Sequence, residues 1–403
     1  MAPTPIVRPA RRPLMSSAAA LGALGLLLAG CASGGEADDS ESETITLAAS
    51  YPLTGESAAY GISTQKGLLL AVDEINAQGG IDGKQVVVKE FDDKCDATEG
   101  ANVGNQIISD TSIEMVVGTV CSGATNAMYP ITAAADIPLF SATASNPALA
   151  ENGWDLFTRV IPTDTYQSVL LDKLAGSLGY ERIAVVASND DYGQQIVSSL
   201  QDHAEQYGVE IVAEERYTTG QISDFTPILT NLRAADPDVI VLGGYYGEMG
   251  PLVSQSPTVF GSDGIPFIGG SQAQTQEFLA LAGDAADDTV TIAQLYDVSS
   301  TSPENTEFVE KFEAEYGELP DFQAAYGWDN IWILKEAVEA NGGDLDGITD
   351  AIKGVTTTGA TGTVEFAENG NNVAEVGVVI RIVDGEFVFD AEATDAMVAY
   401  TAR

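Results

Sequence analysis

Small hydroxyl-bearing residues follow two neighbouring apolar runs within the stretch 113–147. The runs 113–117 and 136–140 are short and partly β-branched, which is typical of buried parallel strands. In an open parallel sheet, the turns after such strands lie at the carboxyl edge, where ligands bind. Free backbone N–H groups at the following helix starts, with nearby hydroxyls, would suit a carboxylate. The alternative is that βα turns simply favour small residues. The hydroxyls are those of Ser122, Thr125, Thr143 and Ser145.

Catalytic residues are hard to find in this sequence. The single histidine, His203, lies among polar neighbours in a predicted helix, which indicates a solvated helix face. No nucleophile elbow, P-loop, dinucleotide-binding glycine motif or H-E-x-x-H motif is present. The cysteines form no C-x-x-C pair, so we expect no metal site and no cofactor. We therefore expect a binding protein, and an enzyme is the weakest alternative.

The first 31 residues predict an export signal. Three arginines precede the apolar run 18–29, which is too short to span a bilayer, and the sequence LAGC follows at Leu28–Cys31. LAGC resembles the lipobox of bacterial lipoproteins. By that resemblance Cys31 becomes the first mature residue and carries lipid, so that the membrane is reached through the lipid anchor alone. An uncleaved signal anchor is the alternative, and the arginine pair leaves the Sec and twin-arginine routes both open.

The remaining chain is strongly acidic. Residues 32–43 are small, polar and acidic, and we expect a disordered tether there. Removal of residues 1–31 takes away three Arg and no acid, which leaves 14 basic against 60 acidic side chains, a net charge of −46. This balance argues against nucleic acid or an anionic membrane surface as a partner.

Two cysteines remain after Cys31. In an oxidising compartment Cys95 and Cys121 are expected to form a disulfide, and two free buried thiols are the alternative. A bridge would hold the loop before Cys95 against the first hydroxyl-rich turn, and so would keep that turn rigid.

Strand-like and helix-like segments alternate along residues 44–390, and a hairpin with Asp384-Gly385 at its turn comes near the end. Such alternation predicts parallel sheets with helices on both faces. The length and the number of βα units indicate two α/β lobes.

Nine short motifs stand in order along the chain. Together they resemble the branched-chain amino acid-binding proteins of ABC importers, which have the type I periplasmic binding protein fold. The resemblance covers nearly all of residues 44–390. The motifs are Tyr51–Gly55, Tyr60–Gly61, Ala71–Asn76, Gly79–Gly83, Asp92–Cys95, Gly118–Ser122, Tyr192–Gly193, Gly243–Tyr245 and Ala280–Asp284.

The resemblance implies two Rossmann-like lobes with parallel sheets, joined by three crossings and closing over a ligand by hinge motion. The crossings are expected near 159–162, 293–297 and 358–363. Lobe one would then comprise 44–160 and 297–359, and lobe two 161–296 and 360–403.

The resemblance also implies a set of ligand-binding residues. The carboxylate turn of the family matches Val120, Cys121 and Ser122, and the family's disulfide matches Cys95 and Cys121. The hydroxyls beside that turn match Thr143 and Ser145, and the aromatic wall of lobe one matches Tyr60. The two tyrosines of lobe two that close over the ligand match Tyr192 and Tyr245. A position at the end of a strand in lobe two matches Ser271.

Two departures from the family pattern concern the ligand. The acid that pairs with the ligand's ammonium in the family is replaced here by Ser271 and Gln272, and an apolar contact falls on Gln323. A buried unpaired charge costs several kcal/mol. Another acid, Glu248 or Asp191, is therefore expected to reach the ammonium, helped by polar groups around Ser271; otherwise the ligand carries no ammonium.

We therefore expect a monomeric, lipid-anchored, extracytoplasmic protein that delivers a hydrophobic or branched-chain amino acid to an ABC permease. One alternative is the same class of protein with an amide, urea or another small neutral or carboxylate solute as its ligand. Another is a ligand-sensing module of a membrane receptor, since receptors use the same fold.

Overall fold

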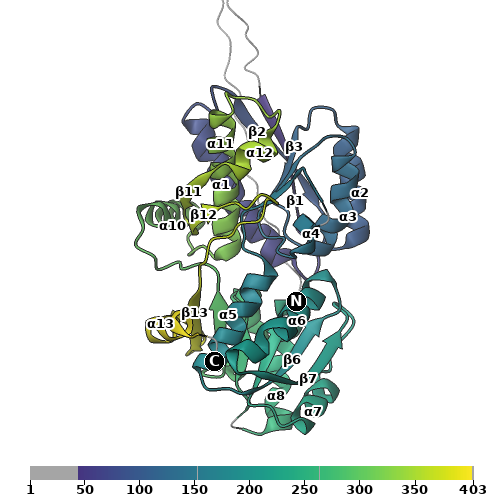
Figure 1. The fold of residues 1–403 in the computed structure, drawn as a ribbon, viewed down its shortest axis with the longest axis vertical. Coiled ribbons are helices and arrows are strands. Elements are labelled where there is room, and N and C mark those ends of the chain that lie inside the picture. The colour runs from purple at the N-terminus through teal and green to yellow at the C-terminus, as the bar shows by residue number, and fades with distance from the viewer. Residues whose placement is uncertain (1–43, 152, 263, 402–403) are drawn as a thin grey trace, which may run out of the picture. The chain divides into compact units, whose positions relative to one another are not determined.

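The computed structural model describes residues 44–401 apart from 152 and 263. The predicted export signal, Cys31 and the acidic tether lie outside the described residues. Within the described ranges, no helix is both long and apolar enough to cross a membrane. The described chain forms two α/β lobes, each built on its own sheet (Figure 1). The predicted fold class, with two sheets dominated by parallel strands, is confirmed.

The sheet of lobe one has five strands, all parallel, in the order β2-β1-β3-β4-β5. Every residue of β3 and β4 is buried, as expected for central strands covered on both faces. Because β3 pairs directly with β4, the two hydroxyl-rich turns leave the same edge of the sheet. The strands are β1 (Thr44–Tyr51), β2 (Gln85–Asp92), β3 (Met115–Val117), β4 (Leu139–Ser141) and β5 (Phe157–Arg159).

Helices from distant parts of the chain cover this sheet, and the green α11 and α12 lie beside α1 in Figure 1. The helices α1 and α11 approach so closely that a Cβ on Gly67 would lie 1.9 Å from the carbonyl oxygen of Ala324, which only glycine avoids. The helices are α1 (Ala58–Ala77), α2 (Ala97–Ser109), α3 (Ser122–Ala133), α4 (Ala148–Glu151), α10 (Pro303–Tyr316), α11 (Phe322–Ala340) and α12 (Ile348–Lys353).

The sheet of lobe two has seven strands in the order β14-β13-β10-β9-β8-β6-β7. Five are parallel, and β13 and β14 add an antiparallel hairpin at one edge, as predicted. Asp384 and Gly385 both have positive φ at its turn, which suits a two-residue loop. The strands are β6 (Arg182–Ser188), β7 (Glu210–Tyr217), β8 (Val239–Gly243), β9 (Phe267–Gly269), β10 (Val290–Gln294), β13 (Val378–Val383) and β14 (Glu386–Phe389).

Side-chain caps fix the start of several helices in lobe two. The carboxylate of Asp190 accepts the N–H of Gly193 at the start of α6, and Thr275 caps α9 in the same way. The helices are α5 (Asp164–Ser177), α6 (Asp191–His203), η1 (Ala204–Tyr207), α7 (Thr226–Ala234), α8 (Tyr246–Phe260), η2 (Ser271–Ala273), α9 (Gln276–Ala282), η3 (Gly283–Ala286) and α13 (Ala391–Ala399).

One helix begins earlier than the sequence predicts. We expected a turn ending at Tyr60-Gly61 and a helix from about residue 68, but α1 already includes both residues. A Cβ on Gly61 would lie 1.7 Å from the carbonyl oxygen of Pro52. Gly61 is therefore needed because segment 52–57 packs directly against α1. In the sequence, a glycine required by such packing looks the same as a glycine in a turn.

A small hairpin lies where the third crossing was expected. Its strands are β11 (Thr356–Gly359) and β12 (Gly362–Glu365), and the carboxylate of Asp329 in α11 accepts the N–H groups of Ala360 and Thr361 at 2.8 and 2.9 Å. These bonds tie the hairpin to lobe one. We infer that the third crossing comes after Phe366, and that the division of the chain into lobes shifts accordingly.

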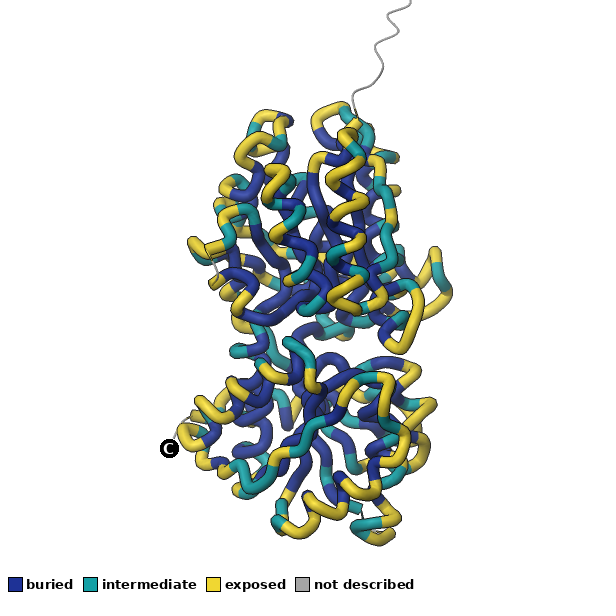
Figure 2. Tube along the Cα trace, turned by 90° about the vertical axis from the view of Figure 1, so that its right-hand side faces the viewer, coloured by how far each residue is buried: buried dark blue, intermediate teal, exposed yellow. Residues whose placement is uncertain are grey.

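Buried residues gather along the strands and the inner helix faces of each lobe (Figure 2). One of them is an acid, Asp172 in α5, which is fully buried and has no hydrogen-bond partner for either carboxyl oxygen. Burial raises the pKa of this carboxyl to about 8. At neutral pH the folded protein therefore holds a mostly protonated Asp172, whereas the unfolded chain releases that proton.

This proton makes stability depend on pH. The contribution of Asp172 is complete below its unfolded pKa of about 4 and is lost as the pH rises through 8. We expect the free energy of unfolding to fall between pH 5 and 9, and Asp172→Asn to reduce that fall by roughly 2–4 kcal/mol. Urea titrations at both pH values measure this. The exposed Asp202→Asn is the matched control, and an equal fall in Asp172→Asn and wild type would contradict the prediction.

Candidate ligand-binding site

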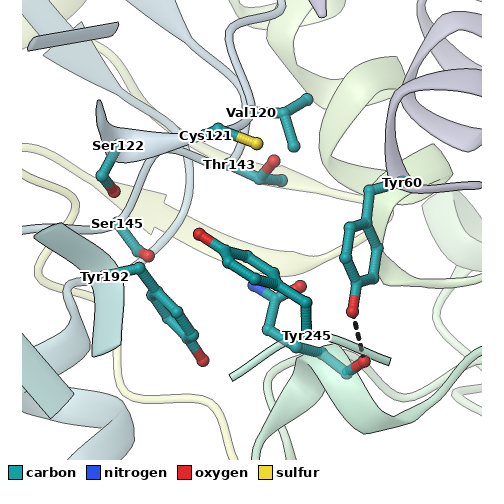
Figure 3. A pocket seen from close by; sticks show the side chains of 9 residues that line it. Tyr60, Val120, Cys121, Ser122, Thr143, Ser145, Tyr192 and Tyr245 are labelled. Carbon is teal, nitrogen blue, oxygen red and sulfur yellow. Dashed lines mark hydrogen bonds between the residues drawn. The ribbon is translucent and has the colours of Figure 1, made fainter. Parts of the chain in front are cut away.

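A small pocket lies between the two lobes, at the carboxyl ends of β3 and β4 (Figure 3). Nine residues line it, and eight of them are among the ligand-binding residues predicted from the sequence. The interior has room for roughly one water molecule, so a leucine-sized molecule enters only if the lobes or the tyrosines move. The lining residues are Tyr60, Val120, Cys121, Ser122, Thr143, Ser145, Tyr192, Tyr245 and Gln272.

The first turn presents the start of α3 to the pocket. Cys121 is the N-cap residue and its side chain caps no backbone N–H, so the first N–H groups of the helix keep their capacity to bind an anion. The hydroxyl oxygen of Ser122 accepts the N–H of Asn146 at 3.2 Å. The hydroxyl proton of Ser122 is therefore free to be donated to a ligand.

The second turn is braced from behind by Arg159, a fully buried residue at the end of β5. Its guanidinium donates to the carbonyl oxygens of Ala144 and Asn146 at 2.9 and 2.8 Å. These bonds fix the backbone on either side of Ser145, whose hydroxyl lines the pocket. Arg159 is the single charged residue in the largely apolar run 156–161. Such a pattern indicates a buried arginine, but the sequence analysis did not identify it.

A disulfide joins Cys95 to Cys121, with their Cα atoms 5.3 Å apart. Closing a loop of this length stabilises a folded chain by about 3.5 kcal/mol in the chain-entropy model. Cys95 itself has φ of +59°, a left-handed conformation that costs energy in a non-glycine residue. The carboxylate of Asp93 accepts the N–H of Cys95 at 2.9 Å and helps to hold that conformation.

The tyrosines of the pocket act as neutral donors. Burial raises the pKa of Tyr60, Tyr192 and Tyr245 well above the usual value, so their hydroxyls stay protonated. The rings of Tyr192 and Tyr245, both from lobe two, lie 5.4 Å apart and form one wall (Figure 3).

A pair of tyrosines also joins the lobes directly. The hydroxyl of Tyr60, in α1, donates to the carbonyl oxygen of Gln272 at 2.7 Å (Figure 3). It also accepts the N–H of Tyr246 at 3.0 Å. The hydroxyl of Tyr246 in turn accepts the N–H of Ala59 at 3.4 Å. The two rings pack edge to face, 5.0 Å between centroids. We call this contact the tyrosine clasp. Sequence analysis missed Tyr246, although it directly follows Tyr245.

Two of the predicted ligand-binding residues, Thr125 and Ser271, do not line the pocket. The hydroxyl of Thr125 donates to the carbonyl oxygen of Cys121 at 2.9 Å, inside α3. Ser271 is likewise bonded within its own lobe. Its hydroxyl accepts from the amide of Gln167 at 3.1 Å and from the N–H of Leu295 at 3.2 Å. Both partners lie within lobe two. The next residue, Gln272, faces the pocket instead. The sequence showed that Ser271 and Gln272 replace the acid of the family, but it did not show which of the two side chains faces the ligand.

The two acids expected to pair with an ammonium do not line the pocket either. Glu248 accepts the N–H of Gly220 at 2.7 Å, and burial raises its pKa. Asp191 accepts from the side chain of Asn126 at 3.2 Å, in an exposed contact. A different acid, Asp164, lies behind Ser145. Burial raises the pKa of Asp164 to about 7, although a hydrogen bond from Ser145 and the positive charge of Arg159 both lower it.

The pocket is thus built to hold a small molecule by hydrogen bonds and apolar contact. Its donors are the start of α3, Ser122 and the hydroxyl of Tyr192, which together favour a carboxylate. Among the residues that the structure describes, no group of three or more His, Cys, Asp or Glu side chains could hold a metal ion.

Two α/β lobes that meet over such a pocket define a solute-binding protein. The family model described as "Periplasmic binding protein" matches residues 44–386, and the chain belongs to this family. The resemblance to branched-chain amino acid-binding proteins is also confirmed. The relatives below are binding proteins, and the chain is a binding protein rather than an enzyme.

Two relatives are named for the amino acids that they bind. The leucine-, isoleucine-, valine-, threonine- and alanine-binding protein of Pseudomonas aeruginosa is 28% identical over 331 residues, covering 82% of this chain and 87% of its own. The leucine-specific-binding protein of Salmonella typhimurium is 29% identical over 320 residues, with coverage of 78% and 81%.

A solved structure shows the same fold. It is the branched-chain amino acid transporter substrate-binding protein of Streptococcus pneumoniae in complex with isoleucine. It is 30% identical and covers 86% of this chain and all of its own, with a TM-score of 0.77.

The tyrosine clasp can be tested without a ligand. Both bonds of the Tyr60 hydroxyl cross between the lobes, so Tyr60→Phe should shift the lobes toward an open arrangement. We expect small-angle scattering to give a larger radius of gyration than for wild type, with unchanged circular dichroism. Tyr316→Phe is the control, because that hydroxyl donates to the carbonyl oxygen of Lys66 within lobe one. Identical radii for Tyr60→Phe and wild type would remove the clasp as a closing contact.

Proposed function

We propose that the chain is an extracytoplasmic, lipid-anchored solute-binding protein of an ABC importer. Its ligand is a hydrophobic or branched-chain amino acid, held between the lobes and delivered to the permease. The observation that carries the proposal is the pocket itself, because donors from both turns of lobe one face the tyrosines of lobe two across it. The ligands named for the Pseudomonas aeruginosa and Streptococcus pneumoniae relatives support an amino acid.

Binding on this proposal proceeds in two stages. The carboxylate first docks on lobe one, where the start of α3 and Ser122 donate to it. The lobes then close, so that Tyr192 and Tyr245 cover the ligand and the tyrosine clasp forms. A monomer suffices for this cycle, since one chain supplies both walls of the pocket.

A second candidate is the same class of protein with an amide or another small carboxylate as ligand. The specific observation in its favour is the uncharged amide of Gln272 in the pocket wall, with Gln323 behind it. A free amino acid brings an ammonium to this wall, and an amide or simple acid does not.

Calorimetry tests the ligand. We expect leucine, isoleucine or valine to bind the purified chain, and Ser122→Ala to weaken binding by about tenfold, because a hydrogen bond to a charged group is lost. The exposed Ser109→Ala in α2 is the matched control. If these amino acids do not bind but 4-methylpentanamide or 4-methylpentanoate does, neither of which carries an ammonium, the second candidate replaces the first. If neither group binds, the proposed ligand class is wrong.

The lipid anchor is tested by fractionation. Cys31→Ala should leave the chain as the uncleaved precursor or release it from the membrane, because only a thiol can receive the lipid. Wild type expressed in parallel gives the reference distribution. A Cys31→Ala protein that stays in the membrane fraction with wild-type mobility would contradict lipidation at this residue.

A further inference from the structure

The wall of the pocket that lobe two supplies carries no charge. It consists of Tyr192, Tyr245 and Gln272, and the residues from lobe one are likewise uncharged. The acids around the pocket are engaged with other groups. Glu248 accepts the N–H of Gly220, and Asp190, beside the Tyr245 hydroxyl, accepts the N–H of Gly193. Asp164 lies behind Ser145, where burial raises its pKa to about 7. A ligand ammonium in the closed cleft therefore finds no carboxylate among the lining residues.

The amide of Gln272 is held in place from the other lobe. Gln323 lies in the first turn of α11, fully buried, and its amide oxygen accepts from the hydroxyls of Thr143 and Thr64 at 2.7 and 3.1 Å. Its oxygen is thereby occupied, and its amide nitrogen donates to the side-chain oxygen of Gln272 at 3.5 Å. We call this chain of contacts the amide bridge.

The amide bridge decides which end of Gln272 is available. Its side-chain oxygen is directed to Gln323, and its backbone carbonyl is bonded to Tyr60. The side-chain nitrogen is left as a donor to a ligand, and the side-chain oxygen, in contact with Gln323 at 3.5 Å, keeps a second lone pair that can accept. A hydroxyl or carbonyl oxygen on the ligand can accept from the nitrogen, and an ammonium can donate to the oxygen, but in neither case does an opposite charge meet the ligand.

We propose that Gln272, oriented by Gln323, makes this a carboxylate site that does not select for an α-ammonium group. The inference rests on the proposed function, since it takes a small aliphatic carboxylate as the ligand. It widens the ligand class from amino acids to their 2-hydroxy and deaminated analogues. Recognition then comes from the carboxylate turn and the apolar contacts, and the substituent on the α carbon contributes little to affinity.

The test compares three ligands that share one carbon skeleton: leucine, 2-hydroxy-4-methylpentanoate and 4-methylpentanoate. Calorimetry on the wild-type chain should give affinities for leucine and the hydroxy acid within tenfold of each other. Gln272→Glu places a carboxylate in the wall at nearly unchanged volume. It should strengthen leucine binding and weaken binding of the hydroxy acid, and so shift their ratio by tenfold or more toward leucine.

Three further variants complete the comparison. Gln276→Glu makes the same change at an exposed position of α9 and should leave the ratio unaltered. Gln323→Met removes the amide bridge without adding charge, and a melting curve for each variant checks that it folds. Asp164→Asn asks whether the acid behind Ser145 holds an ammonium; it should change leucine and hydroxy-acid binding equally.

The outcomes separate this inference from the proposed function. If wild type prefers leucine by more than tenfold, or if Asp164→Asn weakens leucine alone, an ammonium site exists; the inference fails and the amino-acid ligand stands. If Gln272→Glu leaves the ratio unchanged, the role given to Gln272 is wrong. If wild type binds none of the three compounds, the proposed ligand class fails instead.

Discussion

The backbone N–H groups at the start of α3 can bind an anion only if the turn before them stays in place. The Cys95–Cys121 disulfide ties that turn to the loop after β2, and Asp93 holds Cys95 in its left-handed conformation. The second turn depends on Arg159 in the same way. Pre-organised donors lose little entropy when a ligand arrives, so the rigidity of these two turns underlies binding on lobe one.

Closure places different demands on lobe two. Its contacts to lobe one run through single hydroxyl and amide groups, chiefly Tyr60, Tyr246 and the amide bridge. Each neutral bond contributes only about 1 kcal/mol, because water replaces it when the lobes part. Such contacts favour the closed arrangement without locking it. A protein that captures and releases its ligand needs this balance, since a cleft held by stronger bonds would release too slowly.

The charge of the chain contrasts with the neutrality of its pocket. The sequence has 60 acidic residues, yet no acid lines the pocket. One acid buried elsewhere, Asp172, is kept mostly protonated by burial, which raises its pKa to about 8, instead of being paired with a cation. Solvent screens the acids at the surface but reaches the closed cleft poorly, so one lining carboxylate would influence the ligand more than many exposed ones.

Local sequence patterns determined much of this site. Both hydroxyl-rich turns follow short apolar strands, and parallel strands bring their carboxyl ends to one edge, so Ser122 and Ser145 could be assigned before the fold was known. The cysteine pair was predictable from its number and the export signal. Tyr60, Tyr192 and Tyr245 depended on the ordered resemblance, because an isolated tyrosine carries no comparable signal.

Only the tertiary structure decided how the lobes meet. Ser271 and Gln272 are neighbours in a short 3-10 turn, where side-chain direction follows no repeating period that the sequence could show. Gln272 and Gln323 stand 51 residues apart, and Tyr60 and Tyr246 stand 186 apart. These contacts form only where the two lobes meet. No local pattern encodes them, because the groups involved acquire their partners only at that interface.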